Sequence, residues 1–230
     1  MYANGPKIVT DGLVLCLDAA NRKSYPGTGT VWNDLSGNGN NGTFGPSTAA
    51  PTFSGDNGGS LVFDGSNDYI NVGSGSSLTS GYINITVSTW FYPLLNTTRS
   101  DIVTKYLYPQ GWLIYFSSNR FAVDGRENSA TYIQNQSSDT YSVNNWYNIV
   151  FTKNSTNWKV YVNSTIQADN TWGNGTTPFS NSVPFAVGRI GSSPSYAKGQ
   201  ISNVQAYNRA LSADEIRQNY NALKGRYGLT

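Results

Sequence analysis

The sequence predicts an all-β domain in which two antiparallel sheets pack face to face, with one short helix near the C-terminus. Three observations support this fold class. Runs of four to eight residues, rich in β-branched and aromatic side chains, recur along the chain at spacings near ten residues. Clusters of Gly, Pro, Asn and Ser separate these runs, as turn residues do between strands. Residues 212–224 alone have the periodicity of an amphipathic helix.

Strands are expected along the first hundred residues, each bounded by turn residues. A turn at residues 65–68 joins two of them, and Pro93 ends the last, because proline cannot continue a central strand. The expected extended segments cover residues 12–18, 31–35, 60–64, 69–73 and 83–92.

The central segments are expected to form a meander, because four short β-rich runs follow one another with only turn residues between them. These runs are DIVTKYLY, GWLIYFSS, RFAVDG and ATYIQNQ. Two strands around a turn at residues 153–157 follow, and another turn is expected at Asn163 and Ser164. Two late strands are expected in PFAVGRIG and GQISNVQAYN.

The segment SADEIRQNYNALKG is expected to be helical. Ser212 is the N-cap, and Glu215 three residues later completes a capping box. Gly225 follows the expected end of the helix, as a C-terminal glycine often does. One apolar stripe contains Ile216, Tyr220 and Leu223. The helix therefore covers about residues 212–224.

Length and charge exclude several classes of protein. At 230 residues, the chain has the size of one β-sandwich, so we expect an N-terminal arm at residues 1–11 and a single domain at residues 12–230. The net charge is only +2 and no run of Lys or Arg occurs, so nucleic acid and anionic membranes are excluded as partners. No signal peptide or apolar span is found, and Cys16 lies in the apolar run GLVLCLD, typical of a buried thiol. We expect synthesis in a cytoplasm.

Five segments cover nearly the whole chain. They are GLVLCLDAANRKSYPGTGTVWNDLSGNGNNGT, SLVFDGSNDYINV, NITVSTWFYP, NNWYNIVFTKNSTNWKVYVN and GQISNVQAYNRALSADEIRQNYNALKGRYG. In this order they resemble the laminin-G-like branch of the concanavalin A-like jelly-roll lectins. The resemblance implies a two-sheet antiparallel jelly-roll sandwich with one short C-terminal helix. It says less about function, because this fold serves enzymes, lectins, adhesion modules and structural proteins alike.

The two ends of the chain sharpen this resemblance. KIVTDGLVLCLDAANRKSYPG near the N-terminus and YNRALSADEIRQNYNALKGRYG near the C-terminus resemble laminin-G-like proteins of tailed bacteriophages. The resemblance implies a virion protein that is displayed on the capsid or tail, with other virion proteins as partners. A homo-oligomer is also expected, with a trimer as the first guess, because β-rich folds with exposed edges often assemble.

The loop NDLSGNGNNGT combines one carboxylate with amide oxygens and glycine-rich backbone, which are the hard oxygen ligands that calcium prefers. The family resemblance implies a calcium site with Asp34 as the best ligand and Asn38 and Asn40 next. Asp18 and Asn203 become further ligands if the first strand and the GQISNV strand run side by side. A metal-free turn accounts for the same residues, because Asn-Gly and Ser-Gly are preferred in turns. Both readings stay open at this point.

Two acids in FDGSNDY, Asp64 and Asp68, flank a turn. Such a pair could coordinate an ion or act as two acids, but the favoured expectation is that both accept hydrogen bonds from the amides of the turn. Enzymatic chemistry is not expected. The glycosidases of this superfamily need closely spaced acids on one strand, whereas the two glutamates here, Glu127 and Glu215, lie in unrelated settings. The chain also contains no histidine, which excludes Ser-His-Asp and Cys-His arrangements.

Sugar binding depends on which aromatic rings are exposed, because exposed rings stack on pyranose faces. Four aromatic residues lie at strand ends or in polar loops and are the candidate ligand-binding residues: Trp112, Trp172, Tyr108 and Tyr196. Three others lie within alternating strands and are expected in the core: Trp90, Trp146 and Trp158. Two functions follow. The first is a non-enzymatic virion structural protein, with or without the ability to bind glycans. The second is a calcium-dependent adhesin that binds host cell-surface glycan and is not part of the particle.

Overall fold

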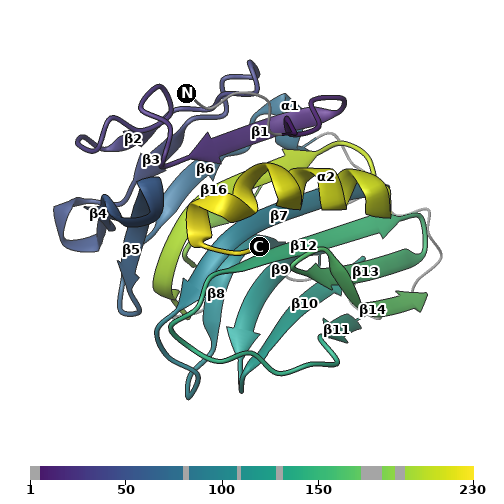
Figure 1. The fold of residues 1–230 in the computed structure, drawn as a ribbon. Helices are drawn as coiled ribbons and strands as arrows, with labels where there is room; N and C mark the ends of the chain where they lie inside the picture. The colour runs from purple at the N-terminus through teal and green to yellow at the C-terminus, as the bar shows by residue number, and fades with distance from the viewer. Residues whose placement is uncertain (1–5, 80–82, 108–109, 128–131, 172–182, 190–194) are drawn as a thin grey trace.

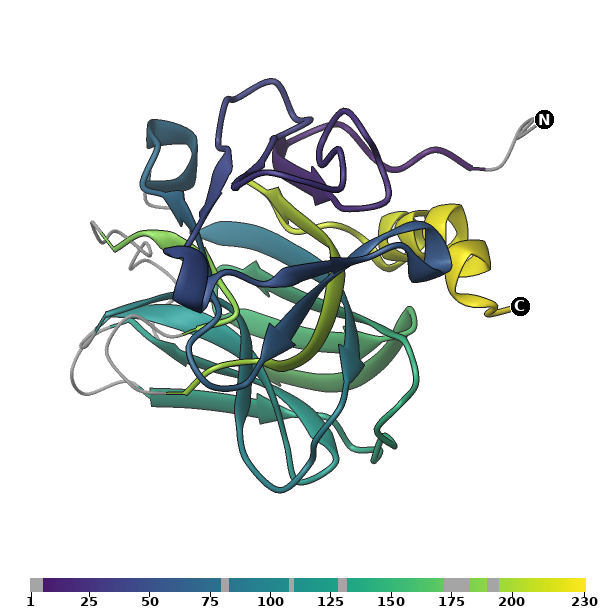
Figure 2. The ribbon, with the colours of Figure 1, turned by 90° about the vertical axis from the view of Figure 1, so that its left-hand side faces the viewer.

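The computed structural model describes residues 6–79, 83–107, 110–127, 132–171, 183–189 and 195–230. Their strands form two antiparallel sheets that lie face to face, with a helix across the outer face of one of them (Figures 1 and 2). The predicted fold class is confirmed, including the single late α-helix of more than one turn. No helix in these ranges is long and apolar enough to cross a membrane.

The first sheet is built around β16, which pairs with β7 on one side and with both β5 and β1 on the other. The order of its strands is β14 (Thr165–Thr171), β13 (Asn157–Val162), β12 (Tyr147–Asn154), β7 (Asn84–Pro93), β16 (Lys198–Tyr207), β5 (Ser60–Asp64) and β4 (Thr52–Ser54), with β1 (Leu13–Asp18) beside β16.

The second sheet contains the predicted meander. Its order is β11 (Tyr132–Gln136), β10 (Arg120–Arg126), β9 (Gln110–Ser117), β8 (Ser100–Leu107), β15 (Phe185–Val187), β6 (Ile70–Gly73), β3 (Gly42–Phe44) and β2 (Val31–Trp32). The hairpin turns fall where the sequence predicts them. Asn163 and Ser164 both have positive φ, at 50° and 62°, which matches the right-handed twist of the strands that they connect.

The turn at residues 65–68 connects the two sheets instead of joining neighbouring strands. β5 belongs to the first sheet and β6 to the second, so the chain crosses the sandwich at this point. The predicted hydrogen bonds are confirmed, because Asp64 Oδ1 accepts from the amide of Ser66 at 2.8 Å and Asp68 Oδ2 accepts from the amide of Asp64 at 2.8 Å. The carboxylates of Asp64 and Asp68 therefore hold the backbone of this crossing segment in place.

The main core lies between the sheets, where inward-facing residues of both alternate with outward-facing ones. All three tryptophans predicted in the core are buried, but in two different places. Trp158 lies between the sheets, whereas Trp90 and Trp146 lie on the outer face of the first sheet beneath the C-terminal segment. This face needs its own apolar layer because α2 covers it (Figure 1).

The helix α2 (Ala213–Leu223) begins with the predicted capping box: Ser212 Oγ accepts from the amide of Glu215, and the Glu215 carboxylate accepts from the amide of Ser212. The α-helix ends before Gly225, as predicted, but Gly225 is not a left-handed cap. The chain continues as a 3₁₀ turn, η3 (Lys224–Tyr227), and the left-handed residue is Gly228, with φ of 69°. Stacking of Tyr227 on Trp90, with centroids 4.1 Å apart, requires this extra turn.

Three shorter helical turns complete the described secondary structure: η1 (Ser47–Ala49), η2 (Asp56–Gly58) and α1 (Ser76–Thr79). The described part of the N-terminal arm lies against α2. The amide of Val9 donates to Asn219 Oδ1 at 2.7 Å, and Gln218 Nε2 donates to the carbonyl of Lys7 at 2.7 Å. Residues from the two ends of the chain are thereby held together over one face of the first sheet.

Candidate functional site

The loop at residues 33–41 runs along the free edge of β1 and is held there by one carboxylate. Asp34 Oδ1 accepts from the amides of Cys16 and Ser36, at 2.8 and 2.9 Å. Asp34 Oδ2 accepts from Ser36 Oγ at 2.7 Å and from the amide of Asn40 at 3.0 Å. Four donors from the protein therefore occupy the carboxylate that was predicted to be the best calcium ligand.

The two predicted asparagine ligands both donate hydrogen bonds from their side-chain amides to other residues of the protein. Asn40 is buried, and its Nδ2 donates to the carbonyl of Val14 and to Ser77 Oγ, each at 2.8 Å. Asn38 is exposed and donates to Ser36 Oγ at 3.0 Å. In the described ranges no group of three or more His, Cys, Asp or Glu side chains could hold a metal ion. Calcium binding by this loop stays a prediction.

The remaining two predicted ligands, Asp18 and Asn203, lie on neighbouring strands, which is the arrangement that the calcium prediction needs. β1 and β16 are antiparallel neighbours and Asp18 is directly opposite Asn203. Asp18 uses its carboxylate elsewhere, because both its oxygens accept from Arg226 Nη1 and one also accepts from the amide of Ala20. The pairing of the strands is therefore confirmed, while the carboxylate is engaged by an arginine near the C-terminus.

The predicted aromatic site is not assembled by the described residues. Trp112 is fully buried, so its predicted exposure is wrong: the alternation of β9 points it between the sheets, where its ring lies 5.5 Å from that of Phe185. Tyr196 is half-buried and its backbone pairs with Arg189. Trp172 and Tyr108 lie outside the described residues, so their role stays a prediction.

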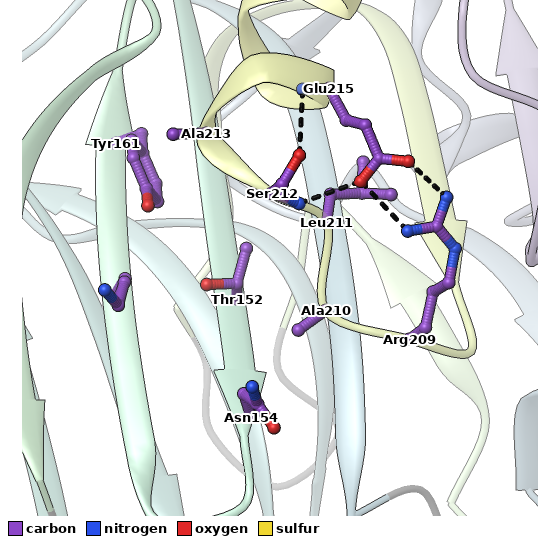
Figure 3. Close-up of a pocket in the computed structure, with 10 residues that line it drawn as sticks. Thr152, Asn154, Tyr161, Arg209, Ala210, Leu211, Ser212, Ala213 and Glu215 are labelled. Carbon is purple, nitrogen blue, oxygen red and sulfur yellow. Dashed lines mark hydrogen bonds and ion pairs between the residues drawn. The ribbon is translucent and has the colours of Figure 1, made fainter.

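A polar cavity lies instead on the outer face of the first sheet. This cavity, which we call the α2 groove, has a volume of about 500 Å³ and lies between the start of α2 and strands β12 and β13 (Figure 3). Its described lining consists mainly of polar side chains: Thr152, Asn154, Lys159, Tyr161, Arg209, Ser212 and Glu215, with Ala210, Leu211 and Ala213 between them.

The floor of the α2 groove follows from the alternation of two strands. Phe151 of β12 points into the core, so alternation places Thr152 and Asn154 on the opposite, outer face of the sheet. Figure 3 shows both residues on β12 below the segment that leads into α2. Thr152 is directly opposite Lys159 of β13. Lys159 Nζ forms an ion pair with Asp169 Oδ2 at 3.0 Å. The floor thus presents a hydroxyl, an amide and an ammonium group.

The wall of the α2 groove is a fixed ion pair. Arg209 donates from Nη1 and Nη2 to the two carboxylate oxygens of Glu215, at 3.0 and 2.6 Å (Figure 3). This hydrogen bonding, together with that from Ser212, lowers the pKa of Glu215 to about 2. The capping residue is therefore ionised at neutral pH and its orientation is set by two partners.

Three side chains in the α2 groove have hydrogen-bonding capacity that the described residues leave unused: Thr152, Asn154 and Tyr161. None of them donates or accepts a side-chain hydrogen bond within the described part of the chain. Burial raises the pKa of Tyr161, which keeps its phenol protonated and able to donate. A hydroxyl, an amide and a phenol at one polar surface suit a neutral ligand that both donates and accepts hydrogen bonds.

Sequence reasoning missed the α2 groove. Strand alternation alone places Thr152 and Tyr161 on outward faces of the expected hairpin, but it does not identify what lies above them. The groove exists because residues 209–215 dock there, and Thr86 Oγ1 of β7 fixes that segment by donating to the carbonyl of Arg209 at 2.9 Å and accepting from the amide of Leu211 at 2.8 Å. These contacts join residues that are 123 and 125 positions apart, so no local sequence signal reveals them.

A second polar cluster lies on β8 and β10 of the other sheet. Arg99 Nε contacts Asp101 Oδ1 at 2.7 Å, and Arg99 Nη1 contacts Asp124 Oδ2 at 3.3 Å. The guanidinium also lies 3.9 Å from the centroid of the Tyr115 ring. Both carboxylates are buried, and burial raises the pKa of Asp101 while Arg99 opposes this effect. One arginine thus compensates two neighbouring acids.

Comparisons with known proteins agree with this architecture. The profile of the concanavalin A-like lectin/glucanases superfamily matches residues 64–217. The binding domain of Paraclostridial Mosquitocidal Protein 1 is similar in structure, with a TM-score of 0.76 and 20% identity over 96% of this chain and 56% of that one. Trypanosoma rangeli sialidase is also similar, with a TM-score of 0.70 and 19% identity over 98% of this chain and 36% of that one.

A third structure is similar over almost its whole length. Domain 4 of AbnA, a GH43 extracellular arabinanase from Geobacillus stearothermophilus, in complex with arabinotriose, has a TM-score of 0.69 and 18% identity over 90% of this chain and 98% of that one. At these identities the three similarities establish the fold alone. This chain spans about half or less of the first two of these structures. No curated protein matches the chain in sequence.

Proposed function

Because the chain belongs to the concanavalin A-like lectin/glucanases superfamily, we propose that it is a non-catalytic glycan-binding module whose binding surface is the α2 groove. The observation that carries this proposal is the free polar lining of the groove. Thr152, Asn154 and Tyr161 offer unused donors and acceptors, which are the groups that recognise sugar hydroxyls. A volume of about 500 Å³ lies within the range of small-ligand sites.

A neutral oligosaccharide suits this groove better than an apolar ligand. The described lining contains the charged pair of Arg209 with Glu215 and the ammonium group of Lys159, so burying an apolar group against it would cost desolvation without new hydrogen bonds. The structure of AbnA domain 4 in complex with arabinotriose supports the same class of ligand, because that domain is similar over 98% of its length.

The acids of the described residues support binding without hydrolysis. Glycosidases use two carboxyl groups across the scissile bond, one of them protonated. Glu215 is the single acid among the described lining residues, and its pKa of about 2 leaves it ionised at neutral pH. Glu127 is buried beside Lys153, and Asp101 and Asp124 share Arg99. None of these acids lies as an exposed protonated group at the groove.

A glycan array followed by titration tests the proposal. The wild-type chain is applied to immobilised neutral oligosaccharides that include arabinotriose, and the best ligand is titrated by calorimetry against the double variant Thr152→Val/Asn154→Ala. Loss of two hydrogen bonds predicts at least about tenfold weaker binding. The matched control is Thr165→Val/Asn221→Ala, which makes the same chemical changes at exposed positions outside the groove. Absence of any glycan binding would refute the function, and binding unchanged in the groove variant would refute the site.

Display on a bacteriophage particle is part of this proposal, resting on the resemblance of the two chain ends to phage proteins. Mass spectrometry of purified particles of the phage that encodes the chain is the test. Detection at high copy number on the head or tail would support a virion component. Its absence from the particles, together with a positive glycan array, would favour a free or cell-surface lectin.

A further inference from the structure

A second cavity lies at the opposite edge of the first sheet, where the loop after β1 meets β4 and η2. This cavity, which we call the β4 pocket, has a volume of about 170 Å³. Arg22, Tyr25, Pro26 and Phe53 line it together with Gly55 and Gly58. None of these residues takes part in the α2 groove or in the predicted calcium loop, so the β4 pocket needs its own explanation.

One wall of the β4 pocket is an exposed aromatic ring. Phe53 is 38% exposed although it lies on an edge strand, where a large apolar side chain is a liability unless it is used. Its ring centroid lies 5.6 Å from that of Tyr25, and Tyr25 in turn stacks on Phe44 at 5.4 Å. The Tyr25 hydroxyl donates to the carbonyl of Gly29 at 3.0 Å. The exposed ring therefore rests on a rigid support.

The charged group of the β4 pocket is an arginine without a partner. Arg22 is exposed, and no side chain or carbonyl in the described ranges forms a hydrogen bond or ion pair with its guanidinium. A guanidinium presents a planar fork that matches a carboxylate. Lys23, the next residue, is also exposed but does not line the pocket. Arg22 and Lys23 therefore carry the same charge, and only Arg22 is placed to contact a ligand in the pocket.

We propose that the β4 pocket binds a single sugar ring that carries a carboxylate, such as a uronic or sialic acid residue. The Phe53 ring contacts the apolar face of the sugar, and Arg22 pairs with its carboxylate. The volume of about 170 Å³ is well below the ~300 Å³ at which pockets hold drug-sized ligands, which limits the site to one ring. Gly55 and Gly58 leave the wall free of side chains where the ring hydroxyls would lie.

This inference is independent of the α2 groove, since the two cavities share no lining residue. The test uses ligand-observed NMR with the methyl glycosides of glucuronic, galacturonic and N-acetylneuraminic acid, each beside its neutral counterpart. At least one acidic glycoside is expected to bind about tenfold more tightly than its neutral partner. If none binds at millimolar concentration, or if acidic and neutral partners bind equally, the proposal is wrong.

Five variants locate the effect. Arg22→Gln should reduce binding of the acidic glycoside to that of the neutral one, whereas Lys23→Gln should leave it unchanged. Phe53→Ala should remove binding of both, and Phe53→Leu, which keeps apolar volume without a flat ring, should weaken both by about tenfold. Equal losses in Arg22→Gln and Lys23→Gln would instead indicate non-specific attraction and overturn the site. Thr152→Val/Asn154→Ala should leave acidic-sugar binding intact, which separates this proposal from the α2 groove.

Discussion

Arg226 donates from Nη1 to both carboxylate oxygens of Asp18, at 2.9 and 2.8 Å. The pair connects the turn after α2 to the last residue of β1, although the two residues are 208 positions apart. Asp18 is buried, so the arginine compensates a carboxylate that water does not reach freely. Beside it, Tyr227 stacks on Trp90, and together these contacts hold the C-terminal segment against the first sheet.

Replacing Arg226 should destabilise the fold. Arg226→Gln leaves the buried Asp18 carboxylate with only the amide of Ala20 as a hydrogen-bond donor, and we expect a loss of about 1–3 kcal/mol in the free energy of unfolding. Urea denaturation measures this loss. Arg217→Gln is the control, because Arg217 forms an exposed pair with Asp214 and should cost less than about 0.5 kcal/mol. Equal effects in both variants would contradict a special role for the Asp18 pair.

Asp34 should stabilise the loop at residues 33–41 whether or not calcium is present. Asp34→Asn keeps the shape of the side chain but replaces one acceptor oxygen with a donor that faces the Ser36 and Asn40 donors or the amide of Cys16. We expect a loss of about 2–3 kcal/mol in chelator, measured by thermal or urea denaturation.

The same experiment tests the calcium prediction. A bound ion would raise the melting temperature of the wild-type chain in millimolar calcium, because a ligand that binds only the folded state adds stability. The increase should disappear in Asp34→Asn if Asp34 is a ligand. A wild-type melting temperature that is the same in calcium and in chelator would leave the hydrogen-bonded turn as the whole explanation of the loop.

Glu215 should make stability depend on pH in the acidic range. Hydrogen bonding from Arg209 lowers its pKa to about 2, below its ordinary value of 4.5. The contribution is therefore fully present above pH 4.5 and is lost as the pH falls toward 2. Because the pair is partly exposed, we expect about 1–2 kcal/mol, less than the full shift would give.

Comparing the wild-type chain with Glu215→Gln isolates this contribution from that of the other acids. The variant should be less stable at pH 7 and should lose less stability than the wild type between pH 4.5 and 2. Urea midpoints across this range give the difference. Parallel pH profiles for the two proteins would show that Arg209 does not hold Glu215 in its ionised form.

Local signals in the sequence predicted much of the fold. The capping box at Ser212, the hydrogen-bonded acids at Asp64 and Asp68 and the burial of Cys16 each depend on a few neighbouring residues, and all are confirmed. Trp112 shows where this reasoning fails. Its place near the end of an expected strand suggested exposure, but the alternation of β9 carries the tryptophan inward.

The candidate sites could not be predicted in this way, because their parts come from distant segments. The α2 groove requires residues 209–215 to lie over the hairpin of β12 and β13. The β4 pocket requires the loop after β1 to meet β4, so that Phe53 reaches Tyr25. Strand periodicity gives the face on which a side chain lies, but the pairing order of the sheets determines which faces and loops become neighbours.

The pair of Lys153 and Glu127 gives the last prediction, because both side chains are buried, at 0% and 1% exposure. Lys153 Nζ lies 3.5 Å from Glu127 Oε1 and donates to the carbonyl of Ile83 at 2.9 Å, while burial lowers its pKa. Glu127→Gln leaves a buried ammonium without its carboxylate and should cost about 3–5 kcal/mol by urea denaturation. The double variant Lys153→Met/Glu127→Leu removes both charges and should recover most of that loss. If the double variant is as unstable as Glu127→Gln, the cost comes from packing and not from an unpaired charge.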